Sequence, residues 1–67
     1  MDDEIIQIEV ALNFINTLLA KANYFKDSKV ADELTSLRHD IYYGKIFQYP
    51  DIIKKLQGIN LVLNKYE

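Results

Sequence analysis

Residues 39–50, HDIYYGKIFQYP, decide how the second half of the chain folds. They include the only histidine, the only proline and one of the two glycines of the sequence. Gly44 stands where a glycine in the left-handed conformation ends a helix, and Pro50 stands where a first-turn proline begins one. The stretch therefore predicts a corner between two helices, with Tyr49 held in an extended backbone by the proline that follows it.

On both sides of this corner, apolar residues recur at helical spacing. Residues 29–43 carry a narrow seam with spacings of four, three and four: Val30, Leu34, Leu37 and Ile41. Asp27 or Ser28 is placed to cap the start of that helix. Residues 50–65 carry the main face of the next helix, which Tyr66 extends: Ile52, Leu56, Ile59, Leu63 and Tyr66. Gly58, in mid-helix, costs about 1 kcal/mol relative to alanine, so it either permits close approach of another helix or is a tolerated weakness.

Residues 3–24 predict a third helix that is apolar on two sides. At about 100° per residue, one stripe contains Ile5, Ile8, Leu12, Ile15, Leu19 and Ala22. A second stripe, on roughly the opposite side, contains Ile6, Val10 and Phe14. A helix that is apolar on two faces is normally buried on both. We therefore expect the first stripe to pack in the core and the second to meet another surface.

The short connections favour one all-α domain over residues 1–67, an antiparallel three-helix bundle or a helical hairpin plus a helix. A chain of 67 residues buries only about 60% of the surface that its unfolded form exposes. The usual additional supports are disulfides, a structural metal or oligomerisation. Because the chain has no cysteine and one histidine, disulfides and thiolate metal sites are excluded. The sequence therefore predicts that dimerisation completes the fold.

Charge and hydropathy patterning argue against two classes of partner. The net charge is −2 and Lys54–Lys55 is the only adjacent basic pair, so the clustered cations of a nucleic-acid site are missing and we expect no nucleic acid. No uninterrupted apolar run exceeds three residues, so we expect no membrane span. The N-terminus, MDDE, is acidic where a secretory signal is basic. A cytoplasmic location follows as the expectation.

His39 is the residue that most invites a catalytic interpretation, since its neighbours are Arg38 and Asp40. Adjacent residues on a helix point about 100° apart and do not face each other, so the sequence predicts no dyad. The seam at Leu37 and Ile41 places His39 on the solvent side. We therefore expect no enzyme, and we predict no catalytic residue, cofactor, metal ligand or small-molecule substrate.

The aromatic residues of the corner have two interpretations. They cap the open end of a small bundle with their hydroxyl groups in water, or they present a recognition surface, because tyrosine is enriched at interface hot spots. Tyr43 lies off the apolar seam and is the ring that we expect to be most exposed. The predicted interaction residues are Ile6, Val10, Phe14, Tyr43, Phe47 and Tyr49.

These features favour a small homodimeric module that acts by binding another protein. One alternative is a stoichiometric inhibitor, of the immunity or antitoxin type, that blocks a larger partner. A third and weaker hypothesis is a helix-turn-helix DNA-binding regulator. Its recognition helix would begin PDIIKKLQ, which places apolar residues where side chains that read bases are needed.

Overall fold

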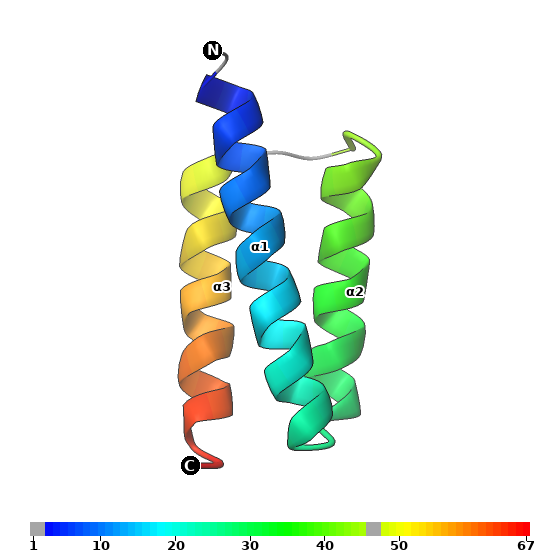
Figure 1. Cartoon of the computed structure of the whole chain (residues 1–67), viewed down its shortest axis with the longest axis vertical. Coiled ribbons are helices and arrows are strands. Elements are labelled where there is room, and N and C mark those ends of the chain that lie inside the picture. The colour runs from blue at the N-terminus through cyan, green and yellow to red at the C-terminus, as the bar shows by residue number, and fades with distance from the viewer. Residues whose placement is uncertain (1–2, 46–47) are drawn as a thin grey trace.

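The computed structural model describes residues 3–45 and 48–67, which form three helices: α1 (Asp3–Tyr24), α2 (Ser28–Tyr42) and α3 (Tyr49–Asn64). Figure 1 shows α1 and α3 running in one direction and α2 in the other, with α1 between them in the view. α1 packs against both other helices, whereas α2 and α3 contact each other much less. The predicted all-α three-helix bundle is confirmed.

Asp27 hydrogen-bonds to the end of α1 and to the start of α2 at the turn between them. Its backbone N–H donates to the carbonyl oxygen of Ala22 at 2.9 Å, and its Oδ1 accepts from the backbone N–H of Val30 at 3.1 Å. Asp27, rather than Ser28, is therefore the N-cap of α2. Lys26 adopts φ 57, a left-handed conformation that costs an L-residue roughly 1–2 kcal/mol.

Gly44 ends α2 as the sequence predicts. Its φ is 69, and its backbone N–H donates to the carbonyl oxygen of Ile41 at 3.1 Å. The N–H of Lys45 donates to the carbonyl oxygen of Asp40 at 3.0 Å. These two bonds form a Schellman motif, in which the left-handed residue turns the chain back over the last helical carbonyls.

The predicted ranges 29–43 and 50–65 each lie one residue later than the observed α2 and α3. The expectation that Tyr49 is extended is wrong, because Tyr49 is the first residue of α3 and the extended residue is Gln48, with φ −124 and ψ 95. The proline at position 50 disfavours a helical conformation at the preceding residue without forbidding it. Here the first turn of α3 overrides that preference.

The core of the described chain is apolar throughout. Its buried members are Ala11, Ile15, Leu18, Ala22, Val30, Leu34, Ile41, Ile52, Leu56, Ile59 and Leu63. The seam of α2 and the main face of α3 are as predicted, except that Leu37 is only half-buried and Tyr66 is exposed. Each of these helices turns one side toward α1, so simple periodicity identifies that side.

The predicted core stripe of α1 needs correction. Of the predicted core stripe only Ile15 and Ala22 are buried, together with Ala11 and Leu18, which lie between the two predicted stripes. Ile5, assigned to the core, is 54% exposed. Because α1 packs against two helices, its buried face points between them and both stripes become flanks. Its first turns also extend beyond the ends of α2 and α3 (Figure 1), where no helix covers them.

By length and composition alone, α1 is apolar enough to cross a membrane. Core helices of water-soluble proteins and signal sequences meet the same criteria, so this is a weak indication. In the structure α1 contributes four residues to the core of a compact bundle. The expectation that no segment spans a membrane stays a prediction.

Candidate interaction surfaces

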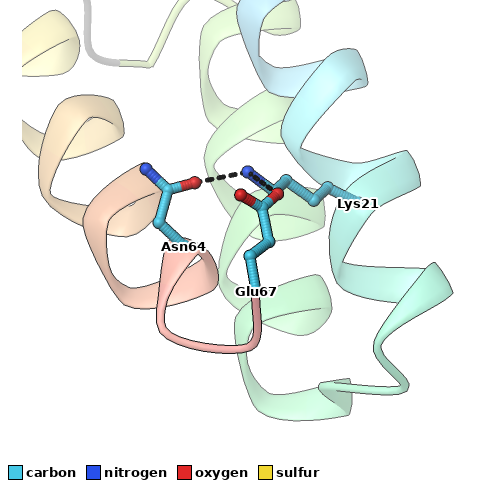
Figure 2. Close-up of polar contacts among 3 residues, drawn as sticks. All are labelled: Lys21, Asn64 and Glu67. Carbon is cyan, nitrogen blue, oxygen red and sulfur yellow. Dashed lines mark hydrogen bonds and ion pairs between the residues drawn. The ribbon is translucent and has the colours of Figure 1, made fainter.

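The first candidate surface, the α1 face, consists of Ile6, Val10 and Phe14. It lies on the flank of α1 that turns toward α3. Lys21, on the same flank, donates from Nζ to Asn64 Oδ1 of α3 (Figure 2). Val10 precedes Lys21 by eleven residues and Ile53 precedes Asn64 by eleven, which is about three helical turns in each case. Val10 and Ile53 therefore lie in the same direction along the two parallel helices from the contact between Lys21 and Asn64.

The α1 face is only partly covered by the rest of the chain. Ile6 is 40% exposed and Val10 is 44% exposed. Phe14 is half-buried and packs against the core, as Ile53 does. The exposed side chains of Ile6 and Val10 therefore lie beside side chains, Phe14 and Ile53, that pack against the core.

The chain exposes more surface than a compact protein of its mass. Its accessible surface is 4823 Å², whereas a compact monomer of 7.9 kDa exposes about 4,400 Å². The molecule is elongated, with extents of 37 × 18 × 16 Å. The excess is consistent with a helix, α1, that is longer than the two helices that cover it.

The second candidate surface, the tyrosine groove, lies between α1 and α2 on the other flank of α1. Its volume is about 400 Å³, and its lining comprises Leu12, Asn16, Thr35, Arg38, His39, Tyr42 and Tyr43. Two residues come from the middle of α1, and the others come from the last three turns of α2 and its C-cap. This groove is a product of helix packing and has no counterpart in any single segment of sequence.

The rings of the tyrosine groove contact one another. The ring centroids of His39 and Tyr43 are 4.5 Å apart, and those of Tyr42 and Tyr43 are 5.5 Å apart in an edge-to-face arrangement. Tyr43 is 65% exposed, but Tyr42 is 73% exposed, so Tyr43 is not the most exposed ring of the corner as the sequence predicted. Both rings are therefore oriented by neighbours while most of their surface remains in solvent.

One hydrogen bond connects the two walls of the tyrosine groove. Arg38 Nη1 donates to Asn16 Oδ1 at 3.2 Å, which holds the guanidinium group over the groove. His39 Nδ1 lies 3.8 Å from Asp40 Oδ1, which is too long for a hydrogen bond. The side chain of His39 is exposed, on the solvent side of α2 as predicted.

The structure brings together only some of the predicted interaction residues. Ile6, Val10 and Phe14 share one flank of α1, whereas Tyr43 lies in the tyrosine groove on the other flank. Tyr49 is half-buried at the start of α3, and Phe47 lies outside the described residues. The sequence offered no signal for the groove residues of α1, Leu12 and Asn16, because their partners are more than twenty positions away.

A third depression, also of about 400 Å³, lies between α2 and α3. Its lining alternates charged and apolar side chains: Asp27, Lys29, Val30, Glu33, Lys55, Gly58, Ile59 and Val62. A Cβ atom placed at Gly58 would meet nothing within 4 Å. No neighbouring helix of the chain therefore requires a glycine at this position.

Among residues 3–45 and 48–67, no group of three or more histidine, cysteine, aspartate or glutamate side chains could hold a metal ion. Comparison with known proteins gives no significant match to any family model, curated protein or solved structure.

Proposed function

We propose that this protein is a small non-enzymatic, cytoplasmic interaction module that forms a homodimer through the α1 face and acts by binding another protein. The observation that carries the proposal is the exposure of Ile6 and Val10 on a helix whose buried face is already complete. Contiguous exposed apolar side chains, rather than single scattered ones, mark interaction surfaces, and Ile6 and Val10 lie one helical turn apart beside the half-buried Phe14.

A two-fold axis through Val10 makes the α1 face complementary to itself. Ile6 and Phe14 are each four residues from Val10, so two antiparallel copies of α1 place Ile6 of one copy opposite Phe14 of the second copy. An interface of this kind uses the same patch on both subunits. In this arrangement Asp3 lies level with Thr17 of the second copy, so the acidic first turns are kept apart.

Dimerisation adds buried apolar surface, of which so short a chain has little. A stable interface buries about 800 Å² on each partner, more than Ile6, Val10 and Phe14 can provide alone. The proposed contact therefore extends onto the neighbouring flank of α3, which carries the partly buried Ile53. The added burial stabilises a core that is small because the chain is small.

The test is the mass in solution, measured by sedimentation equilibrium or light scattering over a range of concentrations. The wild type is expected at twice its 7.9 kDa chain mass. Val10→Glu places two carboxylates at the two-fold axis and is expected to give a folded monomer, with its helical circular dichroism retained. A mixture of Val10→Glu and Val10→Lys is expected to pair again.

Leu61→Glu is the matched control, because Leu61 is an exposed apolar residue on α3, away from the α1 face. This variant is expected to stay dimeric. A wild type that sediments as a monomer at every concentration would refute the homodimer. A Val10→Glu variant that stays dimeric would show that the dimer interface lies on another surface.

A further inference from the structure

We infer that the tyrosine groove binds an acidic segment of a partner protein, which places one apolar side chain against Tyr42 and Tyr43 and a carboxylate beside Arg38. This inference deepens the proposed interaction role, on which it rests, but it does not require the homodimer. It identifies the partner by chemistry: a short peptide segment that combines an aromatic or aliphatic anchor with adjacent aspartate or glutamate residues.

Both walls of the tyrosine groove carry apolar or aromatic side chains that an anchor side chain can contact. Leu12 is half-buried against the core, and Tyr42 and Tyr43 present most of their rings to solvent. The rings of His39, Tyr43 and Tyr42 also contact one another, so they form one aromatic surface. Tyrosine rings beside an aliphatic floor are typical of the pocket that receives an anchor side chain.

The charge of the partner follows from the polar lining. The seven lining residues include one permanent cation, Arg38, but no carboxylate, although the chain as a whole has a net charge of −2. Asp40, next to His39, is the nearest acidic residue in sequence and does not line the groove. The guanidinium is positioned by Asn16 and retains further N–H donors in the planar geometry that suits a carboxylate.

The size of the groove limits what enters it. At about 400 Å³ it lies near the lower end of the range of about 300–1,000 Å³ that ligand pockets span, so it accommodates a side chain rather than a helix. The groove and the α1 face lie on different flanks of α1. In the proposed homodimer both grooves therefore remain accessible, and a partner with two acidic segments would gain from bivalent attachment.

The experiment is a titration of the ¹⁵N-labelled protein monitored by NMR, with two blocked hexapeptides that share an anchor, DEWLDE and KKWLKK. The acidic peptide is expected to shift amide resonances around Leu12, Asn16 and Tyr43. The basic peptide is expected to bind at least about tenfold more weakly, because it presents ammonium groups to Arg38. Equal affinity for both peptides, or shifts centred on another surface, would overturn the inference.

Variants of the groove residues and a third ligand test whether the peptide binds in the tyrosine groove. Arg38→Gln and Tyr43→Ala are each expected to weaken binding of DEWLDE about tenfold, whereas the exposed α3 control Leu61→Ala leaves it unchanged. Indole-3-acetate carries the same ring and a carboxylate without a peptide chain. If it binds as tightly as DEWLDE, the groove is a site for free aromatic acids and the peptide assignment is wrong.

Repeating the titration with Val10→Glu separates this inference from the dimer. Unchanged peptide binding by a monomeric variant supports the groove independently of self-association. If the wild type is a monomer that still prefers DEWLDE, the homodimer fails and the groove stands. If the wild type is a dimer that binds neither peptide, the groove fails and the homodimer stands.

Discussion

The two ends of this bundle are built differently. At the end that holds the α1–α2 turn and the C-terminus, Tyr66 donates from its hydroxyl to Asp27 Oδ2 at 2.7 Å, and its ring stacks on Phe25 with centroids 5.0 Å apart. Lys21 Nζ lies 3.0 Å from Glu67 Oε1 and also contacts Asn64 (Figure 2). These contacts join α1, the turn and the end of α3, and we call this the braced end.

At the opposite end, large side chains also face solvent. Ile5, Ile6 and Val10 of α1 are exposed there, as are the rings of Tyr42 and Tyr43. We call this the open end. The two ends differ in what joins their helices: at the braced end, side-chain hydrogen bonds and an ion pair connect α1 and its turn with the end of α3. Exposure alone does not distinguish them, because Tyr24 and Tyr66 near the braced end are 79% and 51% exposed. Sequence composition alone does not separate the two, because both ends are rich in tyrosine and aliphatic residues.

The largest effect is expected from truncating an aliphatic side chain near the braced end. Leu18 is fully buried in the core, so Leu18→Ala is expected to lower the free energy of unfolding by about 2–5 kcal/mol. Ile5→Ala, at the open end, is expected to change it by less than about 0.5 kcal/mol. Urea denaturation followed by circular dichroism measures both variants. Equal losses would show that the open end is packed in solution.

Replacing each of the two glycines with alanine is expected to change the free energy of unfolding in opposite directions. Gly44→Ala forces a Cβ into the left-handed conformation and is expected to destabilise the protein by about 1–2 kcal/mol. Gly58→Ala meets no neighbouring atom and is expected to stabilise it by about 1 kcal/mol, since alanine favours the helix. Thermal unfolding compares the pair.

A Gly58→Ala variant that is less stable, or whose mass in solution changes, would show that another molecule approaches α3 closely at this point. That result would assign the close approach to an intermolecular contact, because no described residue of the chain lies within 4 Å of a Cβ atom at Gly58.

The smallest effect is expected at the exposed Tyr66–Asp27 hydrogen bond, through its pH dependence. The hydroxyl of Tyr66 and the backbone N–H of Val30 lower the pKa of Asp27 from its ordinary value of 3.8. The stability from this carboxylate is therefore present above pH 3.8 and is lost as the pH falls through its lowered pKa. Asp27 in turn raises the pKa of Tyr66 above 10.0, so that contribution is lost as the pH rises through the raised value.

Tyr66→Phe removes the bond and is expected to flatten both the acidic and the alkaline limb of stability plotted against pH. Melting temperatures measured from pH 2 to pH 11 would show it. Tyr24→Phe is the control, because Tyr24 is an exposed ring that packs edge-on against Phe25. An unchanged pH profile for Tyr66→Phe would mean that the hydroxyl of Tyr66 does not brace Asp27 in solution.

Local chemistry made much of the fold predictable. Gly44 marks the end of α2 because a left-handed turn favours glycine. N-cap preferences narrowed the start of α2 to Asp27 or Ser28, and the structure selects Asp27. The faces of α2 and α3 follow from periodicity, since each helix buries a single side. Periodicity was misleading for α1, because a helix between two neighbours buries the sector between its apolar stripes, here Ala11 and Leu18.

The sequence by itself determined the helices, their ends, the apolar character of α1 and the presence of tyrosines near the corner. Only the tertiary structure decided which apolar residues stay exposed and that Leu12, Asn16 and Arg38 join two tyrosines in one groove. The physical reason is that helix formation depends on interactions within a few residues, whereas a groove depends on the register between helices. That register is set by the packing of the whole core.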